Sequence, residues 1–261
     1  MKPVVAPTAV AKPAGRPKWA HWFELGIGFG ITGRNFAADP PPPRVANALA
    51  PTLRLDGTVY PLAFSWKRAY GLFAGLGLGL SLDLPFWPPF TAKTDVTQTL
   101  PAAEFRVEGG LRWKITLYKP LPRPQLTLLV EGGLHQFLFA NAADGTRLVG
   151  TPDVRYIYAA IGGRFTVHFA DWSWIWAQFQ YHAVTDSGPI QLRANYGIAA
   201  TVGFRIAAGL DFLVWRGIRL GVQGSYERFA ARYGYDPEAV QKRSTSVDEY
   251  FGAVLVLGYV F

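Results

Sequence analysis

Cysteine is absent from this sequence, and methionine occurs once, at the first position. Without cysteine the chain has neither a disulfide framework nor a thiolate metal site. It also has no run of about 18 uncharged apolar residues, which excludes a membrane-spanning helix even though half of the residues are hydrophobic. Glycine (28 residues) and aromatic residues (15%) are frequent instead. This composition favours many β-strands in one domain over a helical bundle.

No segment concentrates the formal net charge of +8, since Lys and Arg are spread over the whole chain. A protein that binds nucleic acid usually gathers its basic residues into a patch or stripe. A scattered excess indicates instead contact with anionic lipid, or an interior and rim of mixed charge. We therefore expect no nucleic-acid partner.

The N-terminus lacks the apolar segment of about 7–15 residues that a secretory signal contains. Residues 1–18 are rich in Pro, Ala and Lys and are expected to form an extended linker, followed by one domain over 19–261. We expect a signal to have been removed before residue 1.

The segment 103–117 alternates between two kinds of side chain along its whole length. Its odd positions are apolar or glycine, among them Phe105 and Leu111, whereas five of its even positions carry a charge. Alternation with a period of two is typical of a strand with two different faces. The segment is longer than the usual strand of about 3–10 residues in a globular protein.

The same alternation recurs along the rest of the chain. It is clear in three further segments and weaker in six, which predicts about ten strands. The clear segments are 21–32, 70–84 and 175–183, and the weaker ones are 52–63, 125–139, 154–169, 196–214, 218–229 and 247–261.

The connections between these segments alternate between short and long. Short ones lie near 64–69, 119–124, 170–174 and 215–217, and long ones near 34–51, 85–102, 140–153, 184–195 and 230–246. This order predicts an antiparallel up-and-down meander whose short turns all lie at one end. With an even number of strands, both termini fall at that end.

Most tryptophans also fall near the end of the short turns. Indole rings favour a membrane–water interface, so this placement indicates an aromatic girdle, although tryptophans that fill the turns of a soluble barrel are the alternative. The residues concerned are Trp19, Trp22, Trp66, Trp113, Trp172, Trp174, Trp176 and Trp215.

A soluble barrel of the lipocalin kind would alternate in the same way, with its apolar face inward. Here large apolar side chains continue along one face of every expected strand. The interior of a ten-stranded barrel has no room for so many, whereas lipid accommodates them all. We therefore expect the apolar face to point outward.

The last residues place Leu255, Leu257, Tyr259 and Phe261 on one face, with an aromatic residue at the end. This pattern resembles the C-terminal β-signal of bacterial outer-membrane β-barrel proteins, and with the meander the resemblance extends over nearly all of 19–261. It implies an all-β fold, namely a transmembrane antiparallel up-and-down barrel of about ten strands with short periplasmic turns and long extracellular loops. It also implies a place in the cell outer membrane, contact with its lipid and lipopolysaccharide, and the barrel-assembly machinery as a transient partner.

Polar side chains on the opposite strand faces would line the lumen of such a barrel. About eight strands are already filled by side chains and porin channels need about sixteen, so ten leave little open space. Because confined charges must be paired, we expect a salt-bridged plug, with a narrow and weakly anion-preferring channel as the alternative. The expected charge network consists of Arg54, Asp56, Glu104, Arg106, Glu108, Arg112, Lys114, Glu131, Arg164 and Arg205.

No catalytic residue, cofactor or metal ion is expected. The candidates near the loop end for an omptin-like protease are Asp83, His182, Asp186 and Asp248, but the spacing of His182 and Asp186 does not match that family. The four histidines show no metal-ligand spacing. The glycine-rich segment 26–33 lies within an expected strand and lacks the Lys-Ser/Thr of a phosphate-binding loop.

One long loop carries Phe86, Trp87 and Phe90 between prolines. Rigid aromatic loops offer contact area at low entropic cost, so these residues are candidates for contact with a partner, unless they only pack over the barrel mouth. The linker 1–18 is a second candidate.

The expected function is a non-enzymatic structural or interaction component of an envelope assembly, of a secretion or motility type. A narrow channel is the alternative, and a surface enzyme of the omptin or lipid-A-modifying type is the third.

Overall fold

The computed structural model describes residues 22–39, 48–64, 73–86, 91–93, 99–139, 153–192, 196–234 and 244–260. These residues form eleven strands and three short helices. The strands are β1 (Phe23–Asp39), β2 (Ala48–Val59), β3 (Leu76–Pro85), β4 (Thr91–Lys93), β5 (Thr99–Thr116), β6 (Arg123–Phe139), β7 (Val154–Ala170), β8 (Ser173–Asp186), β9 (Ala199–Trp215), β10 (Ile218–Tyr233) and β11 (Thr245–Val260). The helices are α1 (Pro61–Phe64), η2 (Phe73–Gly75) and η3 (Gly188–Gln191).

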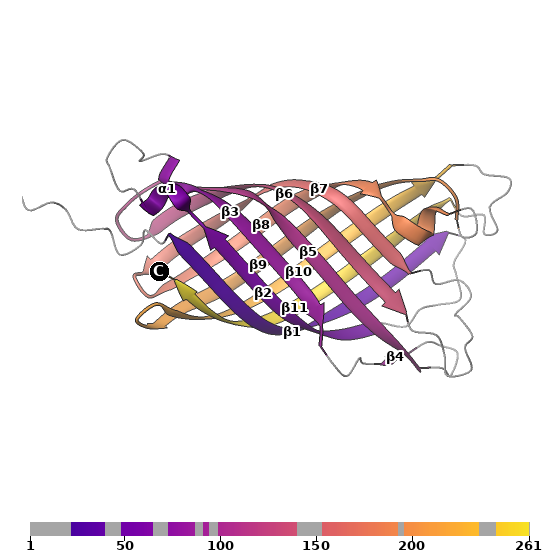
Figure 1. The fold of residues 1–261 in the computed structure, drawn as a ribbon, viewed down its shortest axis with the longest axis horizontal. Coiled ribbons are helices and arrows are strands. Elements are labelled where there is room, and N and C mark those ends of the chain that lie inside the picture. Colours follow the sequence, from indigo (N-terminus) through magenta and orange to yellow (C-terminus); the bar gives the residue numbers. More distant parts are fainter. Residues whose placement is uncertain are drawn as a thin grey trace, which may run out of the picture.

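Ten of the described strands close into a barrel (Figure 1). Neighbours along the chain pair in antiparallel order from β5 through β11, β11 then pairs with β1, and the series continues through β2 to β3. A final antiparallel pairing of β3 with β5 completes the cylinder. The short β4 adds three residues to the end of β5. Closure leaves no edge strand along the barrel wall, as a bilayer requires.

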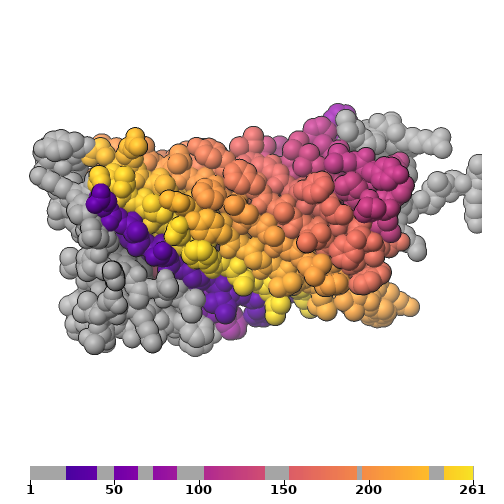
Figure 2. Space-filling model, turned by 180° about the vertical axis from the view of Figure 1, so that it is seen from behind, coloured from indigo at the N-terminus to yellow at the C-terminus, as the bar shows by residue number. Residues whose placement is uncertain are grey.

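The alternation in the sequence determines the two faces of this wall. Apolar side chains project outward along the strands, with exposed fractions of 62% for Ile161, 51% for Leu111 and 51% for Leu257. The intervening side chains are buried inside. Figure 2 shows β1 and β11 lying side by side, oblique to the long axis, on this outer surface. The outward orientation is thus confirmed, and the inward packing of a soluble barrel is excluded.

The short connections gather at one end, here called the turn end, and the long ones at the other, the loop end (Figure 1). Arg216 and Gly217 form the two-residue turn between β9 and β10, with φ angles of 36° and 95°. Two consecutive positive φ angles are what a tight hairpin needs in order to match the twist of its strands. Val260 ends β11 at the turn end, opposite Glu24.

The strands differ from the expected segments at both ends of the barrel. β1 continues to Asp39 because its residues remain paired with β11 up to Asp39 and Thr245. β3 begins at Leu76 and not near residue 70, since Val59 is the last residue of β2 and pairs with Leu78. The connection between β2 and β3 holds α1 and η2, so it is longer than the short turn expected there.

The barrel and its apolar outer surface make this chain a transmembrane antiparallel β-barrel. A lipid-facing wall of this kind requires every backbone group to be satisfied within the protein, which the closed ladder provides. Among the described residues, no helix is long and apolar enough to cross a membrane.

Candidate functional site

The lumen contains three groups of side chains that follow one another along the barrel axis. At the loop end lies an aromatic layer, in the middle a charge layer, and at the turn end a small cavity, here called the vestibule. Each is built by inward-facing residues from strands far apart in the sequence, because successive inward positions on one strand occupy successive depths.

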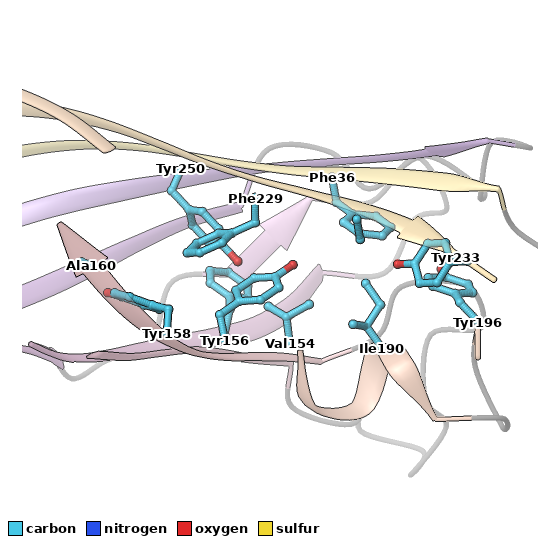
Figure 3. Packing of buried hydrophobic residues seen from close by; sticks show 12 residues of the cluster. Phe36, Val154, Tyr156, Tyr158, Ala160, Ile190, Tyr196, Phe229, Tyr233 and Tyr250 are labelled. Carbon is cyan, nitrogen blue, oxygen red and sulfur yellow. The ribbon is translucent and has the colours of Figure 1, made fainter. Parts of the chain in front are cut away.

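The aromatic layer is a buried cluster of twelve residues (Figure 3). Tyr156 and Phe229 stack at its centre, with ring centroids 4.0 Å apart and an angle of 15° between planes. Ile190 of η3 belongs to the cluster and is fully buried, so this short helix packs into the barrel. The members are Phe36, Phe137, Val154, Tyr156, Tyr158, Ala160, Ile190, Tyr196, Phe229, Ala231, Tyr233 and Tyr250.

An ion pair lies against this layer. Arg34 donates to both carboxylate oxygens of Asp248 at 2.8 Å, and the hydroxyls of Tyr156 and Tyr250 donate to the same carboxylate at 3.0 and 2.9 Å. The guanidinium also lies 4.7 Å from the ring centroid of Phe137. Aromatic faces and hydroxyls therefore replace the water that both charges lose on burial.

The charge layer consists of ionisable side chains from seven strands, each at most 7% exposed. Arg54 binds Asp83 through two contacts of 2.5 Å, Arg205 donates to Glu108 at 2.8 Å, and Arg106 donates to Glu227 across the lumen. Buried ions are tolerated only when they are paired, because each costs several kcal/mol to desolvate. The members are Arg54, Asp83, Glu104, Arg106, Glu108, His135, His182, Arg205 and Glu227.

Two histidines lie among these charges. Carboxylate oxygens of Glu104 and Glu227 lie 2.9 and 3.0 Å from the two ring nitrogens of His135. The ring of His182 stacks on Tyr158 at 4.3 Å, and the hydroxyl of Tyr158 donates to Glu108 at 2.6 Å. Tyr158 thereby connects the aromatic layer to the charge layer.

The vestibule is a small cavity of about 70 Å³ at the turn end. Its cations are Arg112, Lys114, Arg164 and Arg219. Lys114 pairs with Glu24, Arg112 with Glu131 at 2.9 Å, and Arg219 lies 3.6 and 3.7 Å from Asp56 and Asp211. Arg164 differs from them, since it donates to the Gln178 amide at 2.8 Å and lies 4.5 Å above the ring of Trp176.

The ten charged residues expected in the lumen all lie on its inner face, at two different depths. Arg54, Glu104, Arg106, Glu108 and Arg205 belong to the charge layer. Arg112, Lys114 and Arg164 line the vestibule, where Asp56 and Glu131 pair with its arginines.

The residues considered for a surface protease do not meet at the rim. Asp83 lies in the charge layer bound to Arg54, and His182 is fully buried in the same layer. Asp186 pairs with Arg155 at 2.7 Å on the exposed side, whereas Asp248 pairs with Arg34. The sequence analysis missed the aromatic layer, although Tyr156 and Tyr158 on β7 and Phe229 on β10 fall on the inward face of their strands.

The tryptophan prediction holds only in part. Trp172 and Trp215 are 57% and 60% exposed near the turn end. Trp176, expected in the girdle, is 7% exposed and donates from Nε1 to Asp211 at 2.7 Å, and Trp174 lines the vestibule. The indole donor of Trp176 finds its acceptor inside the barrel, which lipid cannot supply. Trp19 and Trp66 lie outside the described residues.

Leu255, Leu257 and Tyr259 lie on the outer face of β11, with exposed fractions of 67%, 51% and 37%. Phe261 lies outside the described residues, as do Trp87 and Phe90 and the linker 1–18. Phe86 is 45% exposed at the end of β3, and its ring meets that of Phe29 edge to face at 5.7 Å.

A scan against protein-family models and a search of curated proteins found no match. Solved structures with a similar course of the chain include a channel named the COG4313 outer membrane channel from Pseudomonas putida F1, at 10% identity and a TM-score of 0.43, covering 96% of this chain and 99% of that one. Neisserial surface protein A matches at 6% identity and a TM-score of 0.37, covering 91% and 97%. The outer membrane protein OprG from Pseudomonas aeruginosa matches at 12% identity and a TM-score of 0.32, covering 92% and 95%.

Similarities of this size carry no functional assignment. The closed ladder and the apolar outer wall of this chain make it an outer-membrane β-barrel on physical grounds, and the cell outer membrane is its location.

Proposed function

We propose that this outer-membrane barrel is plugged along the charge and aromatic layers and serves as a non-enzymatic structural or interaction component of an envelope assembly, of a secretion or motility type. The observation that carries the proposal is the filling of the lumen. All nine members of the charge layer are at most 7% exposed, and the aromatic layer follows directly toward the loop end.

The energetics of the charge layer support a permanent plug. The Arg106–Glu227 pair joins β5 to β10 across the lumen, and both side chains are at most 5% exposed. Opening a path for ions would separate buried partners, and leaving a buried charge unpaired costs about 3–5 kcal/mol. A ten-stranded lumen offers little space in which such partners could rearrange.

The vestibule favours the second candidate function, a narrow channel. Its lining carries four cationic side chains against the carboxylates of Glu24 and Asp211, and Arg164 bonds an amide oxygen, so the cavity could hold a small anion in this alternative. In this alternative the two inner layers would have to part transiently.

Single-channel recording in planar bilayers distinguishes the two functions. We expect no steady conductance steps from the purified barrel. The double variant Arg106→Ala, Glu227→Ala removes the pair across the lumen and leaves the aromatic layer in place, so it is expected to stay closed as well. Steady, anion-selective steps from the unaltered protein would support the channel and refute the plug.

The interaction role has its own test. Around the barrel, lipid and lipopolysaccharide are the expected neighbours. The proposed contacts to envelope proteins are the loop residues Phe86, Trp87 and Phe90 and the linker 1–18. Crosslinking in cells followed by purification in detergent should recover a defined partner. Deletion of 1–18, or replacement of the three aromatic residues by serine, should abolish that recovery. Isolation of the barrel alone in every case would refute the assembly role.

A further inference from the structure

Three charge-layer residues converge at one place in the lumen. Glu108 comes from β5, His182 from β8 and Glu227 from β10, and their ligand-type atoms all lie within 4.8 Å of one another. Each side chain is at most 3% exposed. An imidazole and two carboxylates form a ligand set that divalent transition metals such as zinc and manganese accept.

Buried polar atoms at this place have no hydrogen-bond partner. Both ring nitrogens of His182 and the Oε1 atom of Glu227 are inaccessible to solvent and make no hydrogen bond with any of the described residues. A buried polar group left unsatisfied costs about 1–3 kcal/mol, so native proteins rarely retain several together. A cation bound between these atoms would satisfy both residues at once.

The distance between Nδ1 of His182 and Oε1 of Glu227 suits two ligands of one metal ion better than a hydrogen bond. Nδ1 of His182 lies 3.4 Å from Oε1 of Glu227. Two ligands each about 2.1 Å from a tetrahedral zinc ion lie about 3.4 Å apart. Glu108 would supply the third ligand, and the oxygen that binds the ion would give up its hydrogen bond from Tyr158 or Arg205.

Three of the four oxygen atoms of the two carboxylates already accept hydrogen bonds, among them both oxygens of Glu108. Glu227 accepts from Arg106 through Oε2, which also lies 3.0 Å from His135, and Glu108 accepts from both Arg205 and Tyr158. Hydrogen bonds of this kind orient metal-binding carboxylates and tune their affinity. The stacking of His182 on Tyr158 fixes the plane of the imidazole.

We propose that Glu108, His182 and Glu227 form a binding site for a single divalent transition-metal ion of the zinc class, which joins β5, β8 and β10 inside the lumen. The ion would bind through imidazole nitrogen and carboxylate oxygen. The site does not depend on whether the barrel conducts, since its ligands are present in either case.

The test measures metal on the folded, untagged barrel purified in detergent. The protein is treated with a chelator, equilibrated with zinc chloride, passed through a desalting column and analysed by mass spectrometry of the elements. We expect about one zinc per chain. Cobalt in place of zinc should give the visible absorption of a tetrahedral nitrogen–oxygen site.

Matched variants separate this site from nonspecific binding. His182→Ala should lose the bound zinc, whereas His168→Ala, which alters a histidine of the vestibule, should retain it. Tyr158→Phe keeps the stacked ring and removes the hydroxyl that holds Glu108, so its affinity should fall by about 10–100-fold, measured by chelator competition. This milder variant keeps the proposal testable if His182→Ala does not fold, which heat-modifiable gel migration would reveal.

Two results would overturn the proposal. One is an unaltered protein that retains no zinc after equilibration. The other is retention of equal zinc by folded Tyr158→Phe, His182→Ala and unaltered protein, which would identify the metal as adventitious.

Discussion

Arg34 and Asp248 stand 214 residues apart in the chain, yet they form a two-contact ion pair at 2.8 Å with both side chains 1% exposed. The pair joins β1 to β11, the two strands whose association closes the ends of the chain into the barrel. It is therefore both a buried electrostatic contact and part of the closure.

Removing one partner of this pair should destabilise the barrel strongly. Asp248→Asn leaves the Arg34 charge buried and partly unpaired, which we expect to cost about 3–5 kcal/mol. The double variant Arg34→Met, Asp248→Leu removes both charges and should lie much closer to the unaltered protein. Urea titration of the barrel refolded in lipid vesicles measures both values. Equal losses in the single and the double variant would show that the pair is not what stabilises this region.

The outer wall predicts a sensitivity to charge that depends on position. Ile161 is 62% exposed near the middle of β7, so Ile161→Arg should cost about 2–4 kcal/mol in a bilayer. Ile198 is even more exposed, at 72%, but precedes β9 at the loop end. Ile198→Arg should therefore cost less than about 1 kcal/mol. The same vesicle titration makes the comparison, and similar costs at both positions would contradict the assignment of the lipid-facing wall.

The tight turn between β9 and β10 predicts a specific intolerance at Gly217. Its φ angle is 95°, and an added Cβ would lie 2.7 Å from the carbonyl oxygen of Val260. We expect Gly217→Ala to destabilise the barrel by about 1–2 kcal/mol or more. Gly224→Ala is the matched control, because the nearest atom to its added Cβ is 3.9 Å away. A smaller effect at Gly217 than at Gly224 would refute this reading of the turn.

The C-terminal residues that resemble a β-signal predict a defect of membrane assembly in cells, without a defect of folding in vitro. Phe261→Gly should reduce the amount of folded protein in the outer membrane several-fold, while the purified variant refolds in detergent as the unaltered chain does. Phe251→Ala removes another outward aromatic residue of β11, 51% exposed, and should assemble normally. Heat-modifiable migration on gels reports the folded fraction in both settings. Normal assembly of the Phe261 variant would remove the basis for recognition by the assembly machinery.

The barrel and the direction of its faces were predictable, because alternation over fifteen or more residues admits few other folds. Leu111 and Glu108 fall on opposite faces for that reason alone, and the structure places them so. The same alternation also predicts an inward position for Trp176, because it shares a face with Gln178. The girdle prediction rested instead on the preference of tryptophan for membrane interfaces. The acceptor Asp211 lies on the adjacent strand β9, where no local pattern identifies it.

The depth of each residue in the lumen was harder to predict. Glu108, His182 and Glu227 meet only because the registers of several strand pairs add up around the barrel. A search for metal ligands at short spacing cannot find a set whose members stand on three separate strands. The insertion of Ile190 from η3 is equally nonlocal, since its loop was expected merely to connect two strands.

Because the chain has no cysteine, a single introduced thiol can report from which end of the barrel the vestibule is reached. A single cysteine introduced at Arg164 would be the sole thiol in the chain, and it would face the vestibule. Membrane-impermeant maleimides that arrive from the loop end would have to cross the filled layers to reach it, whereas the same reagents at the turn end would need to cross neither layer. The barrel thus presents two chemically separate compartments, and labelling from each side in turn would define the boundary between them.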